Sequence, residues 1–269
     1  MSADVEFFRE NGYWIAPKLF DDGLLEQARD HIEHLRRGDY EKGRPPLSNY
    51  RPSGDLRRGL VKIDNGWWAD SVMERFATSP LLGEIAARLL GVPEIRLWHD
   101  QVLYKPGDSG ASGNVGWHQD KGYWQSSSTC DMITAWVAFD DVDEDNGCMR
   151  FVPGSHRWGL VEESDFFNPD LEGQQRSMAL PAGARWSEVP VVLKAGQASF
   201  HHCLLLHGSG PNRSNRPRRS IAVHMMSGEA RLVAGNRHDN ERILLEHGGR
   251  DGDLFRGWWF PRLWPTREG

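Results

Sequence analysis

The run EIRLWHDQVLYK (residues 94–105) decides the fold, because its β-branched, aromatic and aliphatic residues form an extended pattern without helical spacing. The turn-forming cluster PGDSGASGNVG (106–116) follows it directly. The same succession of apolar run and turn cluster continues along the chain, in DMITAWVAFDDV (131–142), CMRFV (148–152), VPVVLKAG (189–196), QASFHHCLLLH (197–207) and RSIAVHMM (219–226). Many short strands with Gly and Pro between them predict a mainly β fold, a double-stranded β-helix or jelly roll of the cupin-like kind.

Before residue 94 the pattern is helical. The segment DDGLLEQARDHIEHLRRG (21–38) repeats apolar residues at helical spacing, with Asp21 or Asp22 as the N-cap. A second helix is predicted from Ser79, its N-cap, to Gly91, with a proline in the first turn. We expect these N-terminal helices to pack on the outside of the jelly roll.

The chain length of 269 residues suits a single domain, with a helical part over about residues 1–93 and a jelly-roll core over about residues 94–269. The segment 161–188 is polar and lacks a clear period, which predicts a long insertion between strands. Ordered insertions of this length often serve as lids or substrate loops.

Composition narrows the class of partner. The chain has 32 Lys and Arg against 38 Asp and Glu, a formal charge of −6, so it has no electrostatic footprint for nucleic acid or for an anionic membrane. It has no apolar leader and no stretch of eighteen apolar residues, which predicts a soluble, cytoplasmic protein. Its three cysteines, Cys130, Cys148 and Cys203, are too scattered for a disulfide framework. We therefore expect a small-molecule substrate.

The stretch NVGWHQDKGYW (114–124) contains a candidate metal site. Residues i and i+2 of an extended strand point to the same face, so His118 and Asp120 are able to direct a nitrogen and an oxygen toward one point. A third ligand is expected from SFHHCLLLH, which offers His201, His202 and His207. Two histidines and a carboxylate with open positions are typical of non-haem Fe(II) oxygenases, but the same set also occurs in hydrolytic zinc sites.

Arg218 distinguishes between these two metals. It follows His207 by eleven residues and begins another predicted strand. A guanidinium held on a strand is suited to binding a carboxylate through two hydrogen bonds. An Fe(II) oxygenase that uses a keto acid as co-reductant needs such an anchor, so the arginine favours the oxygenase.

Three motifs together resemble the phytanoyl-CoA dioxygenase family of Fe(II)/2-oxoglutarate oxygenases. They are GWHQD (116–120), NGCMRFVPGSHRWG (146–159) and LLLHGSGPNRSNRPRRS (204–220). The opening FFRENGYWIAPKLFDDGLLEQAR (7–29) is also similar to the N-terminal strand and helix of that family, so the resemblance covers nearly the whole chain.

The resemblance implies a role for particular residues. The metal ligands of the family map onto His118, Asp120 and His207, and the arginine that binds the far carboxylate of 2-oxoglutarate maps onto Arg218 rather than Arg219, which alternation turns to the opposite face. Four more residues are expected to contact the keto acid or line its pocket, namely Gln101, Lys105, Thr134 and Trp136. Three others are candidates for contacts with the substrate or behind the ligands, namely His202, Trp117 and Trp124.

Fe(II), 2-oxoglutarate and O₂ are thus the implied cofactor and co-substrates. The leading hypothesis is a dioxygenase that hydroxylates an unactivated C–H bond of a small molecule and releases succinate and CO₂. Intact Asp120 favours oxygenation, because related halogenases have a small residue in its place. The alternatives are a Zn or Mn hydrolase or isomerase on the same barrel, in which Arg218 has no role, and a binding protein without catalysis, which a complete ligand set disfavours.

Overall fold

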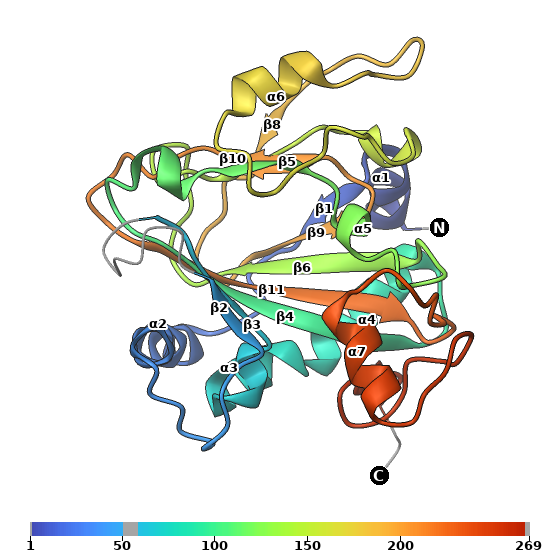
Figure 1. Ribbon diagram of the computed structural model, residues 1–269. Helices are drawn as coiled ribbons and strands as arrows, with labels where there is room; N and C mark the ends of the chain where they lie inside the picture. The colour runs from blue at the N-terminus through green and yellow to red at the C-terminus, as the bar shows by residue number, and fades with distance from the viewer. Residues whose placement is uncertain (1, 51–58, 267–269) are drawn as a thin grey trace.

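Two antiparallel β-sheets face each other in the computed structural model, which describes residues 2–50 and 59–266 (Figure 1). Within these residues the larger sheet has eight strands in the order β1-β9-β6-β11-β4-β3-β2, with β12 paired to β4. These strands are β1 (Tyr13–Ile15), β2 (Ser48–Tyr50), β3 (Val61–Asp64), β4 (Ile95–Lys105), β6 (Met132–Ala138), β9 (Ala198–His202), β11 (Arg218–Ser227) and β12 (Arg262–Trp264).

The smaller sheet has the order β5-β10-β7-β8. Its strands are β5 (Val115–His118), β7 (Met149–Phe151), β8 (Val189–Pro190) and β10 (His207–Ser209). From β4 to β7, and again from β9 to β11, consecutive strands alternate between the two sheets. This alternation is the jelly-roll arrangement predicted from the sequence, and every predicted run from residue 94 to residue 226 contributes a strand.

The strand β11 lies at the centre of the larger sheet, and its register decides which side chains share the inner face. Arg218 is paired with Lys105 of β4, and His224 is paired with both His99 of β4 and Thr134 of β6. Directly opposed residues of an antiparallel pair lie on the same face of the sheet. Polar side chains from β4, β6 and β11 therefore meet between the two sheets, while the alternate residues of these strands form the main apolar core on the other face.

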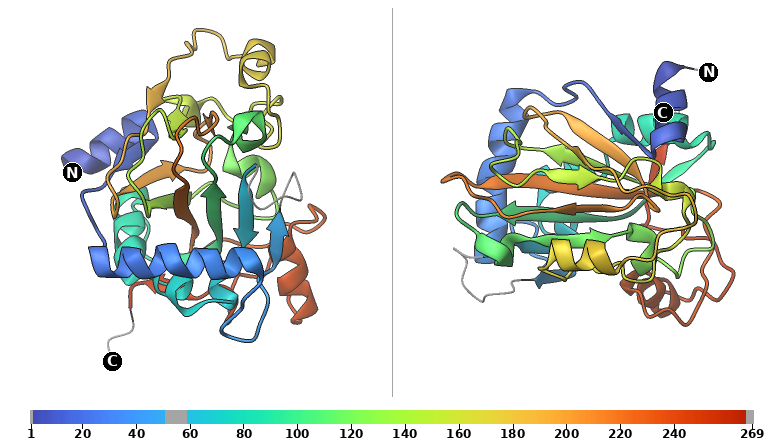
Figure 2. Two further views of the ribbon diagram at one scale, coloured as in Figure 1. Left: turned by 90° about the vertical axis from the view of Figure 1, so that its left-hand side faces the viewer. Right: turned by 90° about the horizontal axis from the view of Figure 1, so that it is seen from above.

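Helices cover that other face of the larger sheet. They are α1 (Ala3–Asn11), α2 (Asp22–Arg37), α3 (Ser71–Ala77) and α4 (Pro80–Leu90), with a short 3₁₀ helix η1 (Gly66–Trp68). Both predicted helices are confirmed: the Asp21 carboxylate accepts a hydrogen bond from the Leu24 amide at 2.9 Å and so caps α2, and α4 ends at Gly91 with φ +74°. Figure 2 shows α2 lying along the larger sheet, on the side of the molecule away from α6.

The jelly-roll core contains more helix than the sequence predicted. The additional short helices are α5 (Asp120–Tyr123), α6 (Leu171–Ser177), α7 (Asp239–Glu246), η2 (Gly110–Gly113) and η3 (Ser155–Arg157). The insertion 161–188 carries α6 and lies between β7 and β8, next to β5 (Figure 1). Within residues 2–50 and 59–266, no helix is long and apolar enough to cross a lipid bilayer.

Asp100 is a fully buried carboxylate on β4 that faces the helices. It accepts hydrogen bonds from the Gly66 amide at 3.1 Å and the Trp67 amide at 3.3 Å, and so holds η1 against the sheet. Burial in this position raises the pKa of Asp100 to about 8.

We predict that the stability contributed by Asp100 falls as the pH rises. The carboxyl binds its proton more tightly in the folded chain than in the unfolded chain, so its contribution is complete below about pH 4 and is lost by about pH 8. Chemical denaturation of wild type and Asp100→Asn measures this, because the variant does not titrate. The free energy of unfolding of wild type relative to the variant should fall by at least about 1 kcal/mol across this range. A difference independent of pH would contradict the prediction.

Candidate metal centre and adjoining pockets

Three buried side chains converge at the end of the smaller sheet. His118 on β5 is paired with His207 on β10, and their ring centroids are 4.0 Å apart. Nε2 of His118 lies 3.6 Å from Oδ1 of Asp120, and Nε2 of His207 lies 3.7 Å from the same oxygen. Each residue offers one ligand atom to a group whose atoms all lie within 4.8 Å of one another.

Asp120 is not on a strand, which differs from the sequence-based expectation. The strand β5 ends at His118, and Asp120 begins the helical turn α5. Gln119 between them is still extended, with φ −118° and ψ 127°, so the two flanking side chains stay on one side. The Gln119 side chain fixes this junction, because it donates to the Gly159 and Leu204 carbonyls at 2.7 Å each.

Backbone carbonyls fix the orientation of the His118 and His207 rings. Nδ1 of His118 lies 2.8 Å from the Gly116 carbonyl, and Nδ1 of His207 lies 2.9 Å from the Leu205 carbonyl. A carbonyl only accepts, so Nδ1 donates in both rings and Nε2 is the nitrogen that faces Asp120.

The charges at this site are those that a divalent metal requires. Burial, together with the nearby His118 and His201, lowers the pKa of His207 well below its ordinary value. Burial alone would raise the pKa of Asp120, but the histidines around it, His207 first, lower that pKa well below its ordinary value. Two imidazole nitrogens and one carboxylate oxygen are a fitting donor set for Fe(II).

The second oxygen of Asp120 is held by a buried chain of hydrogen bonds. The Thr134 hydroxyl donates to Oδ2 of Asp120 at 2.7 Å and lies 2.7 Å from Nδ1 of His224. Since the hydroxyl proton is directed to the carboxylate, His224 donates to the hydroxyl oxygen. These hydrogen bonds leave Oδ1 of Asp120 facing Nε2 of His118 and Nε2 of His207.

We predict that Thr134→Val weakens metal binding by about 10- to 100-fold, the usual cost of losing a hydrogen bond behind a ligand. The valine has nearly the same shape but leaves Oδ2 of Asp120 without this donor. Titration of metal-free protein with Fe(II) under argon measures the affinity. Thr134→Ser keeps the hydroxyl and serves as the control. Equal affinities in the valine and serine variants would show that the hydroxyl does not support the carboxylate.

A narrow inner cavity adjoins the metal centre. It is lined by His118, Asp120 and His207, and also by Arg218. Arg218 is 2 % exposed, donates through one terminal nitrogen to the Gly147 carbonyl, and lies with its guanidinium carbon 5.3 Å from the ring centroid of Trp136. Burial lowers the pKa of Arg218 to about 10, so the side chain remains charged at neutral pH. Within the described residues its buried Nε has no hydrogen-bond partner. A buried guanidinium whose Nε–H is free, beside the metal ligands, fits a carboxylate such as that of 2-oxoglutarate.

The predicted pocket residues occupy several positions. Gln101, Thr134 and Trp136 line the inner cavity. Lys105 lies behind that lining, where its ammonium donates to the Ser209 hydroxyl at 2.8 Å and the Gly210 carbonyl at 2.5 Å. Burial, with Arg218 nearby, lowers the pKa of Lys105 well below its ordinary value.

The other three predicted residues differ in their distance from the centre. Trp124 lines the larger outer pocket beside the triad. Trp117 packs against Trp186, with ring centroids 4.9 Å apart, and lines neither of these two cavities. His202 also lines neither cavity. Its ring centroid lies 5.6 Å from that of His156.

Two further histidines reach Asp120. Nε2 of His201, which the sequence offered as an alternative third ligand, lies 3.4 Å from Oδ2 of Asp120. His224 was missed, although a signal was present: it has the same strand parity as Arg218 on β11 and therefore faces the same cavity. Among the described residues, neither ring nitrogen of His201 has a hydrogen-bond partner. The same is true of Nε2 of His224.

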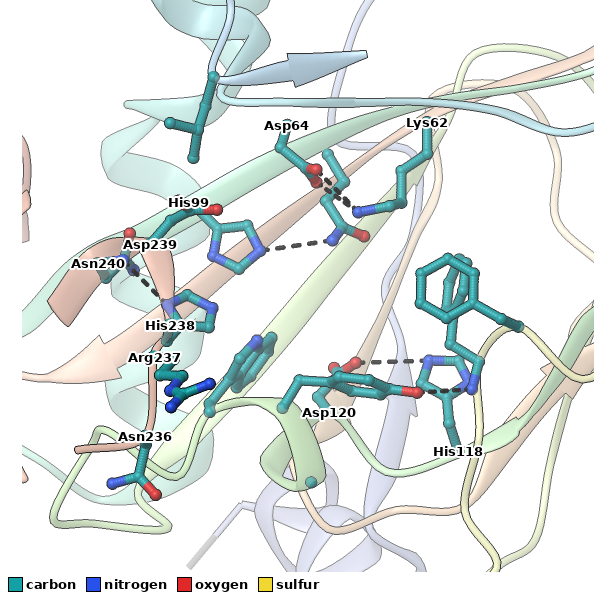
Figure 3. Close-up of a pocket in the computed structure, with 17 residues that line it drawn as sticks. Lys62, Asp64, His99, His118, Asp120, Asn236, Arg237, His238, Asp239 and Asn240 are labelled. Atoms are coloured by element: carbon teal, nitrogen blue, oxygen red, sulfur yellow. Dashed lines mark hydrogen bonds and ion pairs between the residues drawn. The ribbon is translucent and has the colours of Figure 1, made fainter. Parts of the chain in front are cut away.

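The outer pocket, shown in Figure 3, has a volume of about 410 Å³. It shares Gln101, His118, Asp120 and Phe166 with the inner cavity. Its walls come from β3, β4 and α5, from Phe166 and Phe167 of the insertion, and from the residues 236–240 before and within α7. A cavity of this volume holds a small-molecule ligand. A molecule bound there lies next to the metal ligands.

Comparison with known proteins agrees with this geometry. The sequence profile described as phytanoyl-CoA dioxygenase (PhyH) matches residues 8–220. The peroxisomal phytanoyl-CoA dioxygenase of Bos taurus is 26 % identical over 279 residues, covering 95 % of this chain and 79 % of the bovine protein.

Solved structures show the same fold. The α-ketoglutarate-dependent carbocyclase SnoK from nogalamycin biosynthesis superposes with a TM-score of 0.75 at 22 % identity, covering 97 % of this chain and 96 % of SnoK. The epimerase SnoN, in complex with Fe³⁺, α-ketoglutarate and nogalamycin RO, has a TM-score of 0.71 at 26 % identity, with 97 % of each chain covered. This protein therefore belongs to the phytanoyl-CoA dioxygenase family of non-haem Fe(II)/2-oxoglutarate-dependent dioxygenases.

Proposed function

We propose that this protein hydroxylates an unactivated C–H bond of a small molecule held in the outer pocket. The observation that carries the proposal is the joining of two cavities at one ligand set: His118, Asp120 and His207 line the inner cavity, and His118 and Asp120 also line the outer pocket. Co-substrate and substrate thus reach the same point from different sides. The net reaction consumes O₂ and 2-oxoglutarate and forms the alcohol, succinate and CO₂.

In this proposal each residue has a defined task. His118, Asp120 and His207 hold Fe(II), which with 2-oxoglutarate and O₂ supplies the oxidising power. Arg218 binds the far carboxylate of 2-oxoglutarate and fixes its orientation in the inner cavity. Thr134 keeps the Asp120 carboxylate turned toward the metal.

Further residues shape the surroundings of the two cavities. Trp136 and Gln101 line the space for the co-substrate, and Lys105 holds the backbone turn after β10 through Ser209 and Gly210. Trp124 forms part of the wall against which the substrate packs. Residues 1–269 act as one domain, because strands from both ends of the chain share the larger sheet.

Anaerobic titration of the metal-free protein with Fe(II) and 2-oxoglutarate tests the co-substrate site. The expected result is the weak visible charge-transfer band of a keto acid chelated to Fe(II). Succinate formation then serves as the readout in a search for the substrate. No band, together with tight Zn(II) binding and activity without O₂, would instead support a metal-dependent hydrolase.

A further inference from the structure

One wall of the outer pocket is a constrained loop that precedes α7. Arg237 in this loop has φ +58°, a left-handed conformation that few residues other than glycine adopt. The carboxylate of Glu241 holds the loop, because it accepts hydrogen bonds from the Gly235 amide at 2.6 Å and the Asn236 amide at 3.0 Å. Unfavourable backbone conformations kept in place by their surroundings are frequent at ligand sites.

The charges that line the outer pocket are paired except for one. The ammonium of Lys62 lies 2.8 Å from both carboxylate oxygens of Asp64. Asp239 is paired with Arg242 at 3.0 Å, and Asp120 belongs to the metal centre. Arg237 is an exposed residue that lines the pocket, and in the part of the chain that the structure describes its guanidinium has neither a hydrogen bond nor an ion pair (Figure 3).

His238 adds a second donor beside Arg237. Nδ1 of His238 accepts a hydrogen bond from the Asn240 amide at 3.0 Å and so caps α7. Burial lowers the pKa of His238 to about 4, so the ring is neutral and its single proton lies on Nε2. No residue among 2–50 and 59–266 accepts this proton, and His238 lines the same pocket.

We propose that the outer pocket binds a substrate with one oxyanion group, a carboxylate or a phosphate, through Arg237 and His238. This inference rests on the proposed function, because it takes the ligand of the outer pocket to be the substrate. A guanidinium is well suited to two parallel hydrogen bonds with such a group, and an imidazole N–H supplies a third. The remaining wall includes Trp124 and Phe166, which offer apolar contact to the body of the molecule near the metal ligands.

Isothermal titration calorimetry with four matched probes tests this inference. The probes are phenylacetate, benzyl phosphate, neutral phenylacetamide and cationic phenethylammonium. They are titrated under argon into protein loaded with Fe(II) and 2-oxoglutarate, so that the co-substrate fills the inner cavity. Both acids are expected to bind at least about tenfold more tightly than the amide, the effect of one charge-assisted contact, and the tighter acid identifies the preferred group.

Three variants assign the preference to Arg237. In Arg237→Gln the acids should bind no more tightly than the amide, and in Arg237→Lys part of the preference should remain. Arg176→Gln is the matched control for net charge, because the Arg176 side chain is 71 % exposed on α6 and lies outside the pocket lining. Its preference should equal that of wild type.

Three results would overturn the inference. The first is an amide or ammonium probe that binds wild type as tightly as the acids. The second is that the acids do not bind at millimolar concentration. The third is an acid preference that persists in Arg237→Gln. Repeating the titrations with metal-free protein separates this inference from the proposed function: an acid preference that depends on Arg237 can survive there even if the Fe(II)–2-oxoglutarate band never forms.

Discussion

Replacing Asp120 with alanine is expected to reduce Fe(II) affinity by more than about 100-fold, beyond the usual cost of losing a partner behind a ligand. The substitution removes the only carboxylate of the His118, Asp120 and His207 group and leaves two imidazoles. Without the anionic donor the site has less to offset the dehydration of a divalent cation. Anaerobic titration of metal-free protein gives the affinity, and succinate formation from 2-oxoglutarate gives the corresponding loss of turnover.

Asp131→Ala provides the control for this experiment. Asp131 is exposed, lies one residue before β6 and lines neither cavity. Its replacement should leave both measurements at the wild-type value. An Asp120→Ala protein that binds Fe(II) as tightly as the control would refute the assigned ligand set. The Oδ2 neighbour His201 would then be the first residue to test as a ligand.

Arg218→Gln is expected to raise KM for 2-oxoglutarate by about 100-fold, because loss of a buried charged hydrogen bond costs about 3 kcal/mol. The side chain is buried, and its Nε is free to bind the co-substrate within the described structure. The effect should be larger on KM than on kcat, since the arginine lies away from the bond that reacts. Succinate formation at varied 2-oxoglutarate concentration measures both constants.

The adjacent arginine offers a matched comparison. Arg219 is on the opposite face of β11, where its side chain donates to the two Asp140 oxygens at 2.9 and 2.8 Å. Arg219→Gln removes the same charge from the same strand and should leave KM within about threefold of wild type, because Arg219 lines neither cavity. Equal changes in the two variants would mean that net charge, rather than Arg218, governs co-substrate binding.

The strands and the paired ligands were predictable because their signals are local. Alternation and turn residues located each strand from β4 to β11, and strand parity separated Arg218 from Arg219. The same reasoning was incomplete at Asp120, because the strand β5 ends at His118 and only the extended Gln119 preserves the expected orientation. In that case the inference about facing side chains held for a different structural reason.

The outer pocket was not predictable from the sequence, because no single stretch of residues carries a pattern for it. Leu47, Lys62, Phe166 and Arg237 meet there from four separate segments. The short helix α7, which positions one wall, has a histidine as its N-cap instead of one of the commoner Ser, Thr, Asp or Asn residues. Long-range packing assembles such a surface, and a single sequence does not encode it in any one stretch.

One side chain of the insertion links the metal centre to a wall of the outer pocket. Gln174 of α6 completes the edge of β5 like an added strand: its side-chain oxygen accepts from the Trp117 amide at 2.7 Å, and its side-chain nitrogen donates to the Trp117 carbonyl at 2.6 Å. Trp117 directly precedes His118, while the same insertion brings Phe166 to the outer pocket. Exchange of this segment between relatives would therefore alter substrate range and metal retention together. New specificities along this lineage are expected to arise by changes that spare Gln174 and vary the residues around it.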